Sequence, residues 1–192
     1  MTPADPFALA GLVARILERI GVRYVIGGSV AASLYGEPRS TLDLDLMIEA
    51  DAGTVRMLVQ ELRPHFYVEE EDALEAVRRE GSFNAIHLAS AMKVDFFIAE
   101  AGTGARRQMD RRRAINTGGR SLWFYSPEDI VIRKLLWYRM GGEQSEKQWR
   151  DILGILRVTG SAIDRETLLA GARDFEVGEL LERAWKDASA HD

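Results

Sequence analysis

Residues 41–48, with the sequence TLDLDLMI, combine the side-chain period of a β-strand with two carboxylates. Side chains alternate between the two faces of a strand, so Asp43 and Asp45 are expected on one face and the leucines and Ile48 on the other. Two carboxylates held side by side repel each other unless a cation lies between them. Such a pair suits a hard divalent metal, and Mg²⁺ is commonly held by carboxylates together with substrate phosphates. The segment therefore predicts a strand with a metal-binding face.

A glycine-serine turn precedes this strand. Gly27, Gly28 and Ser29 follow a short β-type run at residues 23–26, and Ser29 is a suitable N-cap for a helix over residues 30–35. Glycines let the backbone approach an anion closely, and a helix N-terminus offers unpaired N–H groups. The turn predicts a phosphate-binding site, although any tight strand-to-helix turn favours the same residue types.

Hydrophobic periodicity divides the remaining chain into an α/β part and a helical part. The predicted helices and strands of the first part are helix 6–20, strand 23–26, helix 30–35, strand 42–48, helix 51–62, strand 66–69, a helix through 79, a hairpin of strands 83–88 and 93–98, a short helix through 113, and strand 122–125. The second part predicts helices over 127–140, 145–158, 165–175 and 177–188. We therefore predict an α/β (α+β) core at 1–125, with a mixed sheet flanked by helices, and a helical segment at 126–192 packed on it as one compact unit.

Composition limits the class of protein. Of 192 residues, 46% are hydrophobic and 29% charged, as in ordinary globular proteins, and no apolar run is long enough to span a membrane. The first residues lack the basic region of a signal peptide, so we expect a cytoplasmic protein without a membrane partner. The absence of cysteine excludes disulfides and Cys-ligated zinc. A net charge of −5 argues against a protein that coats nucleic acid non-specifically.

The glycine-serine turn is followed at short spacing by the pattern Arg39-x-Thr41-x-Asp43-Leu44-Asp45. This combination resembles the nucleotidyltransferase superfamily, which includes DNA polymerase β, kanamycin nucleotidyltransferase and the CCA-adding enzymes. The resemblance implies an NTP substrate and Mg²⁺, or Mn²⁺, as the cofactor. It implies that Asp43 and Asp45 bind the metal. It also implies that Gly27, Gly28, Ser29, Arg39 and Thr41 contact the nucleotide.

The same family uses a third carboxylate on a neighbouring strand, and Asp95 in the segment MKVDFFI at 92–98 matches it. An ionised aspartate between Val94 and Phe96 needs a partner, and a shared metal would provide one. The alternative is an ion pair with Lys93 or with an arginine.

Lys134 lies beside the apolar stripe of the helix predicted at 127–140. A lysine in this position either extends its amine to solvent or reaches a buried anion, for which a triphosphate is the candidate. The helical part of the chain resembles the AbiEii and MenT toxins of type IV toxin–antitoxin systems. The residues that carry this resemblance are Glu128-Asp129, Lys134 and Arg150-Asp151. That resemblance implies that Lys134 and Asp151 join the catalytic residues.

These features predict an enzyme that transfers a nucleoside monophosphate from an NTP to an acceptor hydroxyl and releases pyrophosphate. The acceptor could be a tRNA or other RNA, a protein or a small molecule, and a cognate antitoxin is a possible partner. The alternatives are a catalytically inactive nucleotide-binding or antitoxin-partner module of the same fold, and an aminoglycoside-type enzyme with an acidic acceptor pocket. Five arginines, at positions 106, 107 and 111–113, form either a solvated helix face or a contact for phosphate or RNA.

Overall fold

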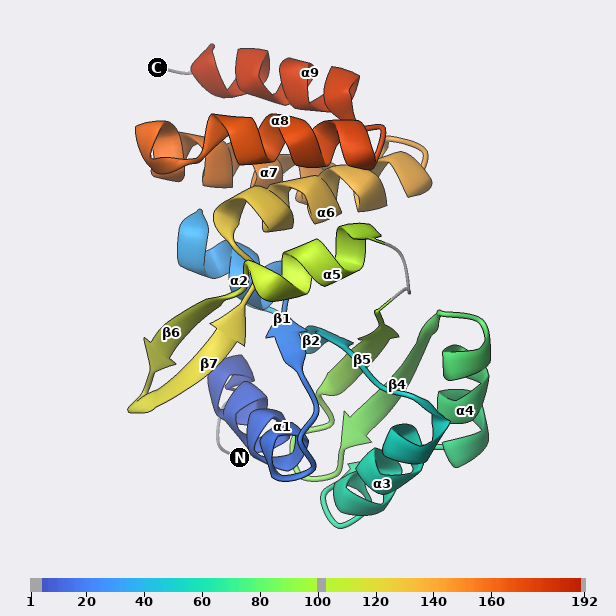
Figure 1. Ribbon diagram of the computed structural model, residues 1–192. Coiled ribbons are helices and arrows are strands. Elements are labelled where there is room, and N and C mark those ends of the chain that lie inside the picture. The colour runs from blue at the N-terminus through green and yellow to red at the C-terminus, as the bar shows by residue number, and fades with distance from the viewer. Residues whose placement is uncertain (1–4, 100–102, 191–192) are drawn as a thin grey trace. The chain divides into compact units, whose positions relative to one another are not determined.

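The computed structural model of the chain describes residues 5–99 and 103–190 (Figure 1). The chain divides into two compact units. The first consists of Met1–Val30 and Ser40–Phe124, and the second of Ala31–Arg39 and Tyr125–Asp192. Each unit is described by itself below.

A seven-stranded mixed sheet forms the first unit, with the strand order β3-β4-β5-β2-β1-β7-β6. The strands are β1 (Tyr24–Ile26), β2 (Asp43–Ile48), β3 (Phe66–Tyr67), β4 (Ser82–His87), β5 (Lys93–Ile98), β6 (Arg113–Thr117) and β7 (Arg120–Phe124). The β2–β5 and β1–β7 pairs are parallel, whereas the β1–β2, β3–β4, β4–β5 and β6–β7 pairs are antiparallel. The central position of β2 places its aspartates between β1, which leads into the glycine turn, and β5, which carries Asp95.

A large part of the apolar core of this unit lies on the sheet face opposite to Asp43 and Asp45. Leu44 pairs with Val94, Leu46 pairs with Phe96, and these four side chains are fully buried. The helices α1 (Pro6–Arg19), α3 (Ala52–Leu62) and α4 (Glu70–Arg78) belong to this unit (Figure 1). Each of them buries apolar side chains. Asp51 caps α3 by accepting a hydrogen bond from the Thr54 amide at 2.7 Å, which satisfies one of the free N–H groups of the first turn. The unit also contains α5 (Thr103–Asp110).

The second unit is helical. Its helices are α6 (Pro127–Met140), α7 (Glu146–Thr159), α8 (Arg165–Asp174) and α9 (Gly178–Ser189), together with the later part of α2 (Gly28–Tyr35) and a 3₁₀ turn at Gly160–Ala162. Ser126 caps α6 by accepting a hydrogen bond from the Asp129 amide, and Pro127 occupies the first helical position, as the sequence predicts. The α6 helix buries several charged side chains, which have to find partners within the protein.

Three predictions about the elements need correction. The α2 helix begins at Gly28, so Ser29 lies within its first turn and is not its N-cap. The helix expected to continue through residue 113 ends at Asp110, and β6 follows, paired with β7 across a turn at Gly118 and Gly119. The β6 strand was missed because its side chains are mostly exposed and show no apolar alternation. The strand expected at 66–69 is limited to Phe66–Tyr67.

Among the residues that the structure describes, no helix has both the length and the apolar character needed to cross a membrane.

Candidate active site

The three predicted carboxylates lie on adjacent strands of the first unit. Asp43 and Asp45 are on β2, and in the parallel β2–β5 pair Asp45 is the register partner of Asp95 while Asp43 is the partner of Lys93. Register partners on neighbouring strands point to the same face of a sheet, so all four side chains lie on one face, opposite to the apolar core. Asp43 is exposed, and Asp45 and Asp95 are half-buried. The sheet register thus brings together the side chains that the sequence could only place on separate strands.

Lys93 forms an ion pair with Asp95. Its Nζ lies 2.8 Å from Asp95 Oδ2, so the ion pair that the sequence left as an alternative is present. The hydrogen bond to Asp95 raises the pKa of the Lys93 ammonium, burial works in the opposite direction, and the charges of Asp95 and of both β2 aspartates raise it further. All three carboxylates therefore act on one ammonium group.

The part of the chain that the structure describes contains no group of three or more His, Cys, Asp or Glu side chains arranged to hold a metal ion. The donor chemistry nevertheless fits a hard divalent cation, since three carboxylates share one face and their charges act on a single cationic group. The metal role of Asp43, Asp45 and Asp95 remains a prediction.

Gly28 leaves the space that the Asp45 carboxylate occupies. A Cβ atom at Gly28 would lie 1.7 Å from Asp45 Oδ2, far inside contact distance, and Gly28 has a φ of +57°, which L side chains rarely adopt. The neighbouring Gly27 amide donates to the Asp45 carbonyl at 2.9 Å. The glycine turn therefore holds the backbone of Asp45 and leaves room for its carboxylate, and the phosphate contact expected for Gly27 and Gly28 remains a prediction.

We expect Gly28→Ala to lower the free energy of unfolding by roughly 2–3 kcal/mol, because the methyl group adds a steric clash to the strain of a positive φ. Urea unfolding followed by circular dichroism measures this loss. Gly118→Ala is the matched control, since Gly118 has a similar φ of +61° but nothing within 4 Å of its Cβ position. It should cost only about 1 kcal/mol. Equal losses in the two variants would show that the clash with Asp45 is unimportant.

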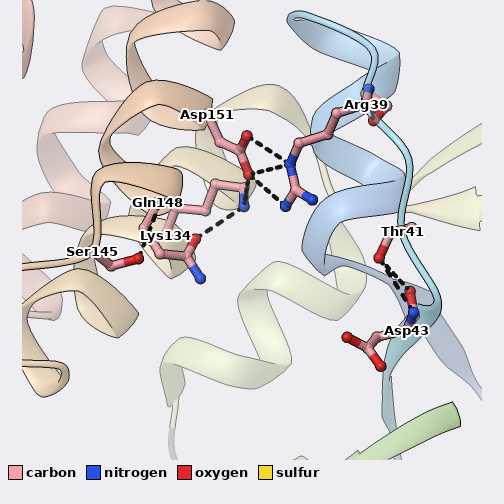
Figure 2. A network of polar contacts seen from close by, with 8 residues as sticks. Arg39, Thr41, Asp43, Lys134, Ser145, Gln148 and Asp151 are labelled. Atoms are coloured by element: carbon pink, nitrogen blue, oxygen red, sulfur yellow. Dashed lines mark hydrogen bonds and ion pairs between the residues drawn. The ribbon is translucent and has the colours of Figure 1, made fainter.

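Thr41 has a local structural role in this structure. Its hydroxyl donates to the Asp43 carbonyl and accepts from the Asp43 amide, both at 3.2 Å (Figure 2). These bonds shape the chain at the start of β2. The nucleotide contact expected for Thr41 remains a prediction.

The second unit holds a buried ionic network around Asp151 (Figure 2). The Lys134 ammonium lies 2.8 Å from Asp151 Oδ2 and donates to Gln148 Oε1 at 3.0 Å. Arg39 approaches the same carboxylate from the other side, with Nε 3.0 Å from Oδ1 and Nη2 3.0 Å from Oδ2. The Lys134 and Asp151 side chains are only 4% and 5% exposed, so the pair is removed from water. Lys134 thus reaches a buried anion, and that anion is a protein carboxylate.

Two glycines let α2 and α7 approach closely enough to form this network. A Cβ atom at Gly36 would lie 2.9 Å from the Ile155 amide nitrogen, and one at Gly154 would lie 3.4 Å from the Glu37 nitrogen. Both positions belong to the second unit, in which Arg39 follows the end of α2. The close backbone contact brings the Arg39 segment to the face of α7 that carries Asp151.

The electrostatic state of Asp151 follows from its partners. Burial by itself raises the pKa of the carboxyl group, but the hydrogen bond from Arg39 and the positive charge of Lys134 outweigh it, so the pKa of Asp151 is lowered. The carboxylate therefore stays ionised and holds two cations in fixed positions.

Sequence reasoning missed one member of these clusters and left another as an alternative. Lys93 lies two residues before Asp95 on the same strand face, and the sequence named it only as one possible ion-pair partner of that carboxylate. Gln148 lies one helical turn before Asp151, so it shares that face of α7, but a glutamine in an amphipathic helix carries little information by itself.

The arginine cluster is not a single helix face. Arg112 lies after the end of α5, stacks over the Trp123 ring at 4.4 Å, and donates to the Met109 carbonyl at 2.7 Å, while Arg113 begins β6. These contacts give Arg112 a role in packing.

No protein-family model and no curated protein sequence matches this chain. Solved structures are similar to it. The antibiotic-resistance factor ANT(2'')-Ia matches over 98% of this chain and 100% of its own, with a TM-score of 0.59 and 17% identity. An antigenic nucleotidyltransferase-like protein from Paracoccidioides brasiliensis matches over 94% and 91%, with a TM-score of 0.56 and 19% identity. The lincosamide antibiotic adenylyltransferase LnuA, in its lincomycin-bound form, matches over 77% and 94%, with a TM-score of 0.52 and 15% identity. The chain therefore has the fold of the nucleotidyltransferases, which confirms the fold class predicted from its sequence.

Proposed function

We propose that this protein transfers a nucleoside monophosphate from an NTP to an acceptor hydroxyl and releases pyrophosphate. The observation that carries the proposal is the alignment of Asp45 with Asp95 across the parallel β2–β5 pair, with Gly28 shaped to admit the Asp45 carboxylate. In the reaction the acceptor oxygen forms a bond to the α-phosphorus, and the bond from that phosphorus to the bridging oxygen breaks. The leaving pyrophosphate takes the electron pair of the broken bond.

The carboxylates of the first unit would hold the metal. Asp43, Asp45 and Asp95 supply the oxygen ligands that Mg²⁺ or Mn²⁺ prefers. When bound, the metal would act as a Lewis acid on the phosphoryl oxygens. Asp95 is the candidate to accept the proton of the attacking hydroxyl, because the resemblance to nucleotidyltransferases places its counterpart on the acceptor side. For that role Asp95 has to release its hydrogen bond from Lys93.

Lys134 and Arg39 would act on the phosphates, as the resemblance to nucleotidyltransferases implies. Lys134 and Arg39 carry the positive charge that developing negative charge on pyrophosphate requires. Asp151 would be a positioning residue, because it bonds to both cations and limits their freedom. Ser29, in the first turn of α2, would add a hydroxyl donor and free helical N–H groups to phosphate binding.

The acceptor class and the biological setting extend this proposal. ANT(2'')-Ia and LnuA are antibiotic-related proteins, which supports a small-molecule hydroxyl as the first acceptor to test. The joined Lys134 and Asp151 side chains support the likeness to AbiEii and MenT toxins, for which an RNA 3′ end or a protein would be the acceptor and a cognate antitoxin the partner.

Incubation of the protein with each α-labelled NTP and with total RNA, cellular protein or hydroxylated antibiotics tests this function. We expect label on one acceptor class, equimolar pyrophosphate, and loss of both products when EDTA removes divalent metal. A tenfold or greater preference for one NTP would identify the donor. Binding of NTP without pyrophosphate release for any acceptor would instead favour the catalytically inactive module.

A further inference from the structure

Lys93 places its ammonium group within the carboxylate cluster of the first unit. It lies on the same sheet face as the three carboxylates, as the register partner of Asp43 and two residues before Asp95 on β5. Its ammonium lies 2.8 Å from Asp95 Oδ2, and its pKa responds to the charges of all three aspartates. A divalent metal held by these carboxylates would need the lone pairs that this ammonium now uses.

The ion pair between Lys93 and Asp95 can exchange for a divalent cation. The three aspartates share one sheet face with the Lys93 ammonium, and a divalent cation carries twice the charge of that ammonium. The Lys93 side chain is 44% exposed and carries its charge on a flexible four-carbon chain, so it can leave Asp95 without unpacking the core. Asp95 is 19% exposed, and once the ammonium leaves it needs another cation.

We propose that Lys93 is the resident counter-cation of the carboxylate cluster and competes with divalent metal for Asp95. The inference rests on the proposed function, because it takes the same three aspartates as metal ligands. When metal is absent, the Lys93 ammonium offsets negative charge of the carboxylates. It weakens metal binding, because the ion pair between Lys93 and Asp95 has to break before the metal can bind Asp95. Lys93 is thus a positioning residue, since it acts through Asp95.

Titration with Mn²⁺ in the absence of nucleotide, with free Mn²⁺ followed by electron paramagnetic resonance, tests the competition. Lys93→Met should bind Mn²⁺ about tenfold more tightly than the unaltered protein, since a charge-assisted hydrogen bond no longer has to break. Lys93→Gln should show the same direction of change, and Lys93→Arg should bind no more tightly than the unaltered protein. In the absence of metal, Lys93→Met should also unfold at a lower temperature, and added Mg²⁺ should raise its unfolding temperature more than that of the unaltered protein.

Arg56→Met is the matched control. Arg56 is exposed on α3 in the same unit, so this variant loses one positive charge without touching the cluster, and its Mn²⁺ affinity should stay within about twofold. Equal Mn²⁺ affinities in Lys93→Met and Arg56→Met would overturn the competition while leaving nucleotidyl transfer, measured with labelled NTP, intact. If neither the unaltered protein nor Lys93→Met bound Mn²⁺, the metal role of the aspartates would fail together with this inference.

Discussion

Simultaneous replacement of Asp43 and Asp45 by asparagine is expected to lower metal-dependent NTP turnover by at least ~10³-fold, the largest change in activity that we predict. The substitution keeps the size of both side chains and removes two of the three proposed ligand carboxylates. The metal would then lose the charge that binds it, and the phosphoryl oxygens would lose its Lewis-acid assistance. Pyrophosphate release at saturating Mg²⁺ with the acceptor identified by labelling measures the loss.

The double variant Glu71→Gln/Asp72→Asn provides the matched control. These two carboxylates lie in the exposed first turn of α4 in the same unit, so the net charge changes equally. Turnover should stay within about twofold of the unaltered protein, because solvated charges act weakly at a distance. Retained turnover in Asp43→Asn/Asp45→Asn would exclude the carboxylate pair as the metal site and would remove the basis of the proposed reaction.

Asp151→Ala is expected to lower the free energy of unfolding by about 3–5 kcal/mol, the largest stability change that we predict. The substitution leaves the Lys134 ammonium, which is only 4% exposed, without its carboxylate partner and deprives Arg39 of a bidentate acceptor. An uncompensated buried charge is the source of the penalty. Chemical denaturation at pH 7 measures it. Glu182→Gln, at an exposed position on α9 in the same unit, should change stability by less than about 0.5 kcal/mol.

A second substitution identifies the cause of that loss. Adding Lys134→Met to Asp151→Ala removes the unpaired ammonium, so the double variant should recover part of the lost stability. If the double variant were less stable than Asp151→Ala, packing around the carboxylate, and not the buried charge, would explain the effect.

The effect of Asp151 should also depend on pH. Its pKa is lowered in the folded protein, so its stabilising contribution is complete above the unfolded-state pKa of about 3.9 and is lost as the pH falls through the folded-state value. The difference in stability between the unaltered protein and Asp151→Ala should therefore be constant near neutrality and shrink below about pH 4. A difference that stayed constant down to pH 2 would contradict the ion-pair assignment.

Local sequence signals predicted the elements that have strong periodicity or strong caps. The α6 helix has the predicted bounds because Ser126 and Pro127 define its start, and the alternating leucines of residues 41–48 predicted β2 to within one residue. The β6 strand was missed because an exposed edge strand needs no apolar alternation, and the arginines before it favoured an extended α5. Ser29 was misplaced because Gly28, with its positive φ, already belongs to α2.

The sequence by itself determined which residues are candidates for the chemistry and which strand face they share. A period of two places Asp43 and Asp45 on one face of a strand, and Asp95 is isolated among apolar residues, because these are properties of local backbone geometry. Only the tertiary structure decided the partners: the register of β2 with β5 aligned Asp45 with Asp95 and gave Asp95 the ammonium of Lys93. The close approach of the end of α2 to α7 gave Asp151 the guanidinium of Arg39, and α6 supplied the ammonium of Lys134. Strand register and helix contact depend on packing between segments distant in the chain, so no local pattern contains them.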